Sequence, residues 1–275
     1  MASLELVRSR DVSVERAEPL VRINRVTMAF GSFTAVKDAS LEVAEGEFLA
    51  IVGPTGCGKS TLLNAVAGLL APTAGTVTVG GEPVTGPNRR VGYLFQQDAL
   101  LPWKTARENV ELGLLFRKAE KAAMRDESLR WLVKVGLKGF EDRYPHQLSG
   151  GQKKRVQMAQ ALIYNPEVIL MDEPFSALDI HTRHLMQNEL LRLWTEHRRS
   201  VVLITHDLEE AIALADRVVV LSAGPASSLV ASFEVPLARP RNPAEIKLDP
   251  LFIELYREIW SRLRVEVEKS YAQRS

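Results

Sequence analysis

A glycine-rich segment that ends in a lysine followed by two hydroxyl residues is the strongest chemical signal in the sequence. It fits the pattern G-x-x-x-x-G-K-[ST] and consists of Gly53, Pro54, Thr55, Gly56, Cys57, Gly58, Lys59, Ser60 and Thr61. Glycines let the backbone fold around a phosphate so that its N–H groups point inward, and the start of a helix adds positive potential. We therefore predict a nucleotide phosphate-binding loop in which Lys59 reaches the β- and γ-phosphates and Ser60 ligates Mg²⁺.

The loop also contains Cys57, the only cysteine in the chain. No general base that would deprotonate its thiol is evident, so we interpret Cys57 as a small filling residue of the phosphate-binding loop and not as a nucleophile. A single cysteine also excludes an intrachain disulfide.

Two adjacent acids follow an apolar run in Val168-Ile-Leu-Met171-Asp172-Glu173. At the end of a strand, Asp172 is placed to hold Mg²⁺, while Glu173 can polarise the water that attacks a γ-phosphate. Two neighbouring carboxylates repel each other unless a cation lies between them and the phosphates. This pair is therefore predicted to belong to the same site as the glycine-rich loop.

A third segment, Leu148-Ser-Gly-Gly151-Gln152, precedes a helical pattern with Val156, Ala159 and Ile163 on one face. Ser149 can cap that helix, and the glycines allow an anion to approach its N-terminus. One nucleotide seldom needs two phosphate-binding helix N-termini from the same subunit. The helix that follows Ser149 is therefore expected to serve a nucleotide held by another copy. The basic run Lys153 to Arg155 is interpreted as a solvated helix face.

The elements that must position these residues alternate between strands and helices, which predicts an α/β layered fold. Apolar runs of strand length are typical of central parallel strands, and they are Phe48 to Val52, Val168 to Met171, Val201 to Ile204 and Val218 to Leu221. After Lys59 a helix is expected with Leu62, Leu63, Val66, Leu69 and Leu70 on one face, closed by Pro72.

Three segments are expected along the chain. The part from about Leu20 to Val84 is β-rich, with a short strand at Val77 to Val79, and residues 102–165 are mostly helical, including a helix from Ala119 to Gly136. We expect an N-terminal extension over residues 1–20, a main domain over 21–222 with a helical insertion at about 102–165, and a tail over 223–275. In the tail, prolines mark an irregular connection, followed by a helix with an apolar stripe that is expected to pack on the main domain, with a partner or dimer contact as the alternative: Phe252, Leu255, Tyr256, Ile259, Trp260 and Leu263.

Composition and charge exclude several classes of protein. The chain has 275 residues, with 35 basic and 34 acidic side chains and a net charge of +1, which argues against a nucleic-acid coat. No apolar run approaches the ~20 residues of a membrane span, and the N-terminus lacks the apolar core of a secretory signal. A cytoplasmic protein without a nucleic-acid partner is expected.

The chain resembles the nucleotide-binding subunit of an ABC transporter over roughly Val21 to Ser222. Its motifs match in order: the Walker A loop (Gly53 to Thr61), the Q-loop (Gln96), the LSGGQ signature (Leu148 to Gln152), the Walker B end (Asp172 and Glu173), the D-loop (Ser176 to Asp179) and the switch histidine (His206). Phe30 resembles the aromatic residue that stacks on adenine.

This resemblance implies a P-loop NTPase fold with an antiparallel β subdomain and a helical insertion. It also implies a dimer, formed with a second copy or a paired ATPase subunit, that holds two ATP molecules head to tail. Each ATP would contact one subunit's loop and Gln96, and the other subunit's signature, Ser149, Gly150, Gly151 and Gln152, with Asp179 nearby. Ser60, Gln96 and Asp172 would surround Mg²⁺, and the catalytic residues would be Lys59, Gln96, Glu173 and His206.

Partners are indicated by the run Leu100-Leu-Pro-Trp103, where a loop is expected, because exposed apolar residues often mark a docking surface. With Ala211 to Val218, this run resembles the ATPases of nitrate, sulfonate, taurine and bicarbonate importers. The implied partners are an integral-membrane permease and, indirectly, an extracytoplasmic solute-binding protein, with the chain at the cytoplasmic face of the inner membrane. Other ABC importers or exporters, and a soluble ABC ATPase acting on ribosomes or DNA, remain alternatives, and burial of the run within the helical insertion is a further one.

Overall fold

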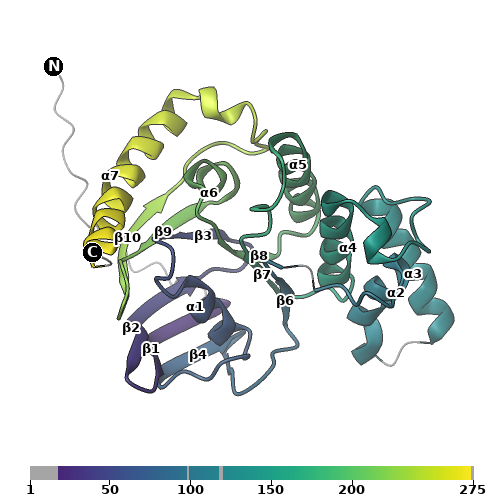
Figure 1. The fold of residues 1–275 in the computed structure, drawn as a ribbon, viewed down its shortest axis with the longest axis horizontal. Coiled ribbons are helices and arrows are strands. Elements are labelled where there is room, and N and C mark those ends of the chain that lie inside the picture. Colours follow the sequence, from purple (N-terminus) through teal and green to yellow (C-terminus); the bar gives the residue numbers. More distant parts are fainter. Residues whose placement is uncertain (1–17, 98, 118–119, 274–275) are drawn as a thin grey trace.

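The computed structural model describes residues 18–97, 99–117 and 120–273, and two β-sheets form its frame (Figure 1). The smaller sheet is antiparallel and has the order β2-β1-β4-β5. Its strands are β1 (Val21–Phe30), β2 (Phe33–Val43), β4 (Ala74–Val79) and β5 (Glu82–Pro83).

The larger sheet has the order β10-β9-β3-β8-β7-β6 and is parallel except where β10 pairs with β9. Its strands are β3 (Phe48–Val52), β6 (Val91–Leu94), β7 (Val168–Asp172), β8 (Ser200–Ile204), β9 (Arg217–Leu221) and β10 (Leu229–Glu234). The four apolar runs predicted as central strands are therefore confirmed as β3, β7, β8 and β9. Strands β3, β7 and β8 are buried along their whole length, because both faces of the sheet are covered.

Helices cover both faces of the larger sheet and extend beyond its β6 edge, where α2, α3 and α4 gather (Figure 1). Helix α1 lies with the smaller sheet and shares its hydrophobic cluster with one face of β3, β7, β8 and β9, while α4 to α7 share a second cluster with the other face. The α-helices are α1 (Lys59–Val66), α2 (Ala106–Glu111), α3 (Lys121–Lys134), α4 (Gly150–Leu162), α5 (Ile180–His197), α6 (Leu208–Leu214) and α7 (Pro250–Ala272), and the 3₁₀ turns are Leu112–Arg117, Pro145–Gln147 and Ile246–Leu248.

The end of α1 and the connection after β9 differ from their predictions. Helix α1 ends at Val66 and not near Pro72, because Gly68 adopts φ +73, which is not a helical conformation. Only glycine fits at this position, since a Cβ would lie 1.8 Å from Gly86 O. Leu69 is consequently 49% exposed instead of continuing the buried face. The connection expected to be irregular contains strand β10, whose residues are only partly buried and so lack the apolar signature of a central strand.

The apolar stripe of the C-terminal helix α7 packs on the main domain, as predicted, through Phe252, Leu255, Ile259 and Leu263. Tyr256 packs at the edge of this contact, whereas Trp260 is 43% exposed, so its inclusion in the stripe was wrong. Residues 1–17 of the expected N-terminal extension, and Ala119 at the start of the expected helix to Gly136, lie outside the described residues. Within the described ranges, no helix combines the length and the apolar composition needed to span a bilayer.

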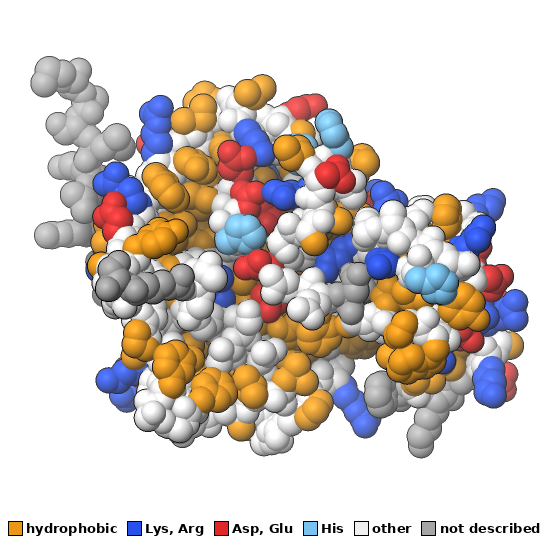
Figure 2. All heavy atoms as spheres, viewed as in Figure 1, with side chains coloured by type: hydrophobic (Ala, Val, Ile, Leu, Met, Phe, Trp, Pro, Cys, Tyr) orange, Lys and Arg blue, Asp and Glu red, His pale blue; other side chains and the backbone are white. Residues whose placement is uncertain are grey.

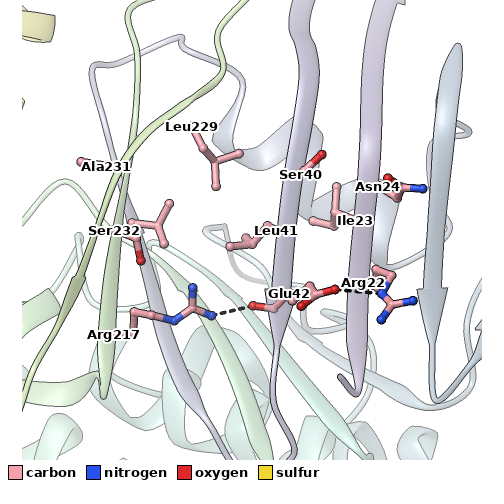
Figure 3. Close-up of a pocket in the computed structure, with 11 residues that line it drawn as sticks. Arg22, Ile23, Asn24, Ser40, Leu41, Glu42, Arg217, Leu229, Ala231 and Ser232 are labelled. Atoms are coloured by element: carbon pink, nitrogen blue, oxygen red, sulfur yellow. Dashed lines mark hydrogen bonds and ion pairs between the residues drawn. The ribbon is translucent and has the colours of Figure 1, made fainter. Parts of the chain in front are cut away.

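The two sheets meet along a seam between β2 and the chain leading into β10. Val36 forms an isolated bridge with Ser227. A cavity of 480 Å³ opens between Leu41 of β2 and Leu229 and Ala231 of β10, where the two strands lie apart (Figure 3). Arg217 donates to Glu42 O at 2.5 Å across this opening. The cavity is lined by none of the residues predicted to bind nucleotide, so the predicted chemistry lies elsewhere.

Candidate functional site

The glycine-rich loop lies between the end of β3 and the start of α1, which is the strand–loop–helix arrangement that its sequence requires. Gly56 and Gly58 have φ +83 and φ +92, backbone conformations that favour glycine. Lys59, only 7% exposed, turns back over the loop, where its Nζ donates to Gly53 O at 2.9 Å and Pro54 O at 3.0 Å. The lysine charge is thereby held inside the ring of loop backbone groups.

Close packing explains why residues of this loop must be small. A Cβ on Gly53 would lie 3.0 Å from Leu221 O and 3.0 Å from Cys57 Sγ, and a Cβ on Gly58 would lie 2.7 Å from Val36 Cγ2. Cys57 is 1% exposed, and burial raises the pKa of its thiol despite the opposing charge of Lys59. A protonated, buried thiol is consistent with a filling residue.

Asp172 ends strand β7 beside the start of α1, where its carboxylate hydrogen-bonds with the Ser60 side chain. The residue is 8% exposed, and its Oδ1 has no hydrogen-bond partner among the described residues. Burial raises the pKa of Asp172 and the neighbouring Glu173 adds to this, while the Ser60 hydrogen bond and the Lys59 charge lower it. A buried carboxylate oxygen without a partner, next to a hydroxyl, suits an oxygen-ligated cation such as Mg²⁺.

Glu173 is the point at which three of the predicted catalytic residues meet. Its Oε2 lies 3.2 Å from Gln96 Nε2 and 3.1 Å from His206 Nδ1. Glu173 has φ +44, a strained conformation for a residue with a side chain, and its N–H donates to Ile204 O at 2.9 Å. The structure thus brings together side chains that are 77 residues and 33 residues apart in the sequence.

The loop after β8 that carries His206 is held by polar contacts that the sequence did not reveal. The Thr205 hydroxyl donates to Glu210, and the Asp207 N–H donates to Thr205 Oγ1 at 3.0 Å. Arg183 of α5 joins Asp207 Oδ2 at 3.2 Å and also donates to Leu178 O at 3.2 Å. Arg183 and Glu210 stand apart from any motif, so only their spatial position identifies them.

The predicted signature segment caps helix α4. Ser149 Oγ accepts from Gln152 N at 3.3 Å, while Gln152 Oε1 accepts from Ser149 N at 2.9 Å, so the predicted cap is confirmed as a capping box. A Cβ on Gly151 would lie 2.7 Å from the Thr182 side chain of α5, and Gly150 has open space around it. Asp179 caps α5 by accepting from Thr182 N at 3.0 Å, and its hydrogen bonds with the Thr182 side chain and backbone lower the pKa of its carboxyl.

The signature segment does not join the glycine-rich loop within one chain. Figure 1 shows α4 at the edge of the helical segment, well separated from α1. The phosphate-binding loop and the carboxylates Asp172 and Glu173 therefore form one group, and Ser149 to Gln152 form another.

The basic run after the signature was wrongly interpreted as a solvated face. Lys154 is 5% exposed, and its Nζ donates to Phe95 O at 2.9 Å and Gln96 O at 3.1 Å. Arg155 Nη1 donates to Val135 O at 3.0 Å. No signal within the run revealed these contacts, because they depend on where residues 95, 96 and 135 lie in space.

Two predicted aromatic contacts lie at the surface. Phe30, at the end of β1, is 49% exposed, which leaves its ring face accessible for stacking. Trp103 is 70% exposed, whereas Leu100 of the same run is 8% exposed, so burial of the whole run is excluded. Figure 2 shows hydrophobic side chains gathered over the helical segment, and acidic and histidine side chains near the centre of the same face.

The fold and the site together define a P-loop nucleotide-binding protein, and comparison with known proteins specifies its family. The sequence profile described as "ABC transporter" matches residues 36–176. The bicarbonate transport ATP-binding protein of Synechocystis is 45% identical over 231 residues, covering 82% of this chain and 81% of its own length. The nitrate import ATP-binding protein of Synechococcus elongatus is 44% identical over 235 residues, covering 83% of this chain and 84% of its own length.

The taurine import ATP-binding protein of Escherichia coli is 41% identical over 247 residues, covering 89% of this chain and 97% of its own length. Among solved structures, the ATP-binding cassette MJ0796, dimeric in a post-hydrolysis state with ADP and Pi, is 34% identical with a TM-score of 0.70, covering 79% of this chain and 100% of its own. The chain belongs to the ABC transporter family, and its α/β fold is that of an ABC ATPase cassette.

Proposed function

We propose that this chain is the ATP-hydrolysing subunit of an ABC importer that drives uptake of a small anion, such as nitrate, sulfonate, taurine or bicarbonate, through a separate permease. The observation that carries the proposal is that Gln96 and His206 meet at the Glu173 carboxylate, next to Asp172 at the end of β7 and Lys59 of the P-loop. The relatives named as bicarbonate, nitrate and taurine importers support the class of solute.

The chemistry is phosphoryl transfer from ATP to water. Lys59 and the loop N–H groups bind the phosphates, and Phe30 offers a stacking face to the adenine. Ser60, Asp172 and Gln96 would hold Mg²⁺, which neutralises charge on the β- and γ-phosphates when bound. Glu173 accepts a hydrogen bond from the attacking water and orients it, and His206 donates toward the γ-phosphate.

The site is completed by a second copy. Ser149, Gly150, Gly151 and Gln152 lie apart from the loop of their own chain, so we propose that they face the γ-phosphate of ATP bound to the partner, with Asp179 at the same boundary. The dimeric MJ0796 cassettes support this arrangement. We further propose a permease in the membrane, an extracytoplasmic solute-binding protein acting through it, and a peripheral position on the cytoplasmic face.

Glutamate-to-glutamine substitution tests the hydrolytic role. Purified Glu173→Gln protein should bind ATP with near-native affinity, while its turnover with Mg²⁺ falls about 10²- to 10⁴-fold, because an amide is a far weaker hydrogen-bond acceptor for water. Glu258→Gln, an exposed substitution on α7, serves as the matched control and should hydrolyse at the wild-type rate. Wild-type turnover in Glu173→Gln would refute the role of Glu173.

The solute is tested by reconstituting the chain with its permease and solute-binding protein in vesicles. Uptake of labelled nitrate, bicarbonate and taurine should require ATP, and one of these solutes should stimulate turnover. Stimulation only by a solute that carries no anionic group would refute the proposed class of substrate while leaving the ATPase intact.

A further inference from the structure

The loop between β9 and β10 connects the phosphate-binding loop to the C-terminal helix. Ser227 of this loop is 0% exposed and docks on β2, where its N–H donates to Ala35 O at 3.1 Å and its carbonyl accepts from Lys37 N at 2.8 Å. Gly224 passes so near the phosphate-binding loop that a Cβ on it would lie 3.4 Å from Gly56 O and 3.5 Å from Cys57 Cα.

The Ser227 hydroxyl donates to the carbonyl of Cys57. The same hydroxyl lies 3.2 Å from Ala35 O, a longer contact than the 2.5 Å to Cys57 O, so its hydrogen is assigned to Cys57. A trans peptide is planar, and its C=O and N–H point in opposite directions. Fixing Cys57 O therefore also fixes the direction of the Gly58 N–H, which belongs to the row of N–H groups that cradle phosphate.

The other end of the same loop is held by the C-terminal helix α7. Glu266 is 1% exposed, and its Oε2 accepts from Ala223 N at 3.0 Å. Its Oε1 accepts from Lys269 Nζ at 2.8 Å, so the buried carboxylate is neutralised within the helix. Although burial alone would raise the pKa of Glu266, these two bonds hold it below its usual value.

We propose that Ser227 and Glu266 are positioning residues for ATP: helix α7 anchors residues 223–227, and through them orients the Cys57–Gly58 peptide that contacts phosphate. This inference rests on ATP binding at the loop, and it gives the C-terminal tail a role inside its own subunit. The Ser227 hydroxyl bonds the Cys57 carbonyl and the Glu266 carboxylate bonds the Ala223 N–H, so both side chains act through loop backbone.

Removing the Ser227 hydroxyl tests the first link. Ser227→Ala should weaken binding of a fluorescent ATP analogue and raise KM for ATP about three- to tenfold, with kcat within about twofold, since one hydrogen bond of ordinary strength is lost from ground and transition states alike. Ser228→Ala is the matched control, because Ser228 contacts Ser222 Oγ through its backbone N–H, and it should bind ATP normally. Unchanged affinity in Ser227→Ala, or an equal loss in Ser228→Ala, would overturn the proposal.

The second link is tested on α7. Glu266→Ala should weaken ATP binding about two- to fivefold, while Glu266→Gln, which still accepts from Ala223 N, should restore it to within about twofold of wild type. Lys269→Ala removes only the ion pair and should leave ATP affinity unchanged. If Glu266→Ala does not fold, Glu266→Asp replaces it, because the shorter carboxylate cannot reach Ala223 N.

The double variant Ser227→Ala/Glu266→Ala should resemble Ser227→Ala, because both changes break one connection. If the double variant loses ATP affinity by the product of the two single-variant losses, or if Glu266→Ala binds ATP like the wild type, the role of α7 is overturned. The direct binding measurement does not depend on turnover. Failure of this inference is therefore distinct from failure of the proposed ATPase, which would appear as absent hydrolysis in the wild type.

Discussion

Asn109 holds the loop that carries Trp103, and its truncation should release that loop. The residue is 0% exposed on α2. Its Oδ1 accepts from Leu101 N at 2.8 Å, and its Nδ2 donates to Leu101 O at 3.2 Å, Lys104 O at 3.0 Å and Thr105 O at 3.0 Å. One amide therefore fastens both ends of the segment on which the exposed tryptophan lies.

The magnitude follows from these bonds. The amide has two hydrogens, so it makes at most about three full hydrogen bonds at once, each with a net value of about 1 kcal/mol. Water reaches part of the opened loop and replaces some of them, so Asn109→Ala should lower the free energy of unfolding by about 2–4 kcal/mol. Asn109→Asp keeps the bond from Leu101 N but turns a carboxylate oxygen toward three carbonyl oxygens. It should therefore lower the free energy of unfolding at least as much as Asn109→Ala does.

Hydrogen exchange and urea unfolding measure the two consequences. Amides of residues 101–105 should exchange faster in Asn109→Ala, while those of strand β3 change only in proportion to global stability. Asn188→Ala, at an exposed position on α5, should alter stability by less than about 0.5 kcal/mol. A loss below about 1 kcal/mol in Asn109→Ala, with unchanged exchange at residues 101–105, would refute the reasoning.

Three further substitutions probe docking, the Gln96 segment and pH dependence. Trp103→Ala should lower reconstituted transport while the ATPase activity of the isolated subunit persists, because the ring is 70% exposed and does not belong to the phosphate-binding loop. Lys154→Met should lower turnover about tenfold, since the carbonyls of Phe95 and Gln96 lose a charged donor. Burial raises the pKa of Glu210 from 4.5 to about 7, so stability should fall as pH rises through this interval, and Glu210→Gln should abolish the fall.

The sign of the last prediction follows from proton uptake. Between pH 4.5 and about 7, folded Glu210 keeps a proton that the unfolded chain has released, so raising the pH favours unfolding by up to about 3 kcal/mol. Equal pH profiles of urea unfolding for Glu210→Gln and the wild type would contradict it. Trp260→Ala is the matched control for Trp103→Ala, and Lys153→Met is the matched control for Lys154→Met. Parallel loss of transport and ATPase in Trp103→Ala, or native turnover in Lys154→Met, would refute those roles.

The sequence by itself determined the elements and residues whose signals are local. A phosphate-binding loop needs glycines at fixed spacing after an apolar strand, and Gly53 to Thr61 satisfy this within nine adjacent positions. Central strands such as Val168 to Met171 are recognisable because both of their faces are buried, so they carry no polar alternation. The resemblance to ABC cassettes depended on the same short motifs and predicted the family that the comparisons show.

Only the tertiary structure decided contacts between residues that are distant in the sequence. Lys154 belongs to a basic run that is indistinguishable in sequence from a solvated face, yet the chain brings two carbonyls of residues 95 and 96 to its ammonium group. Ser227 stands in no motif and reaches Cys57 across 170 positions, and Glu266 reaches Ala223 across 43. Such pairings depend on the relative placement of sheets and helices, which the burial of whole faces determines and which no short window of sequence contains.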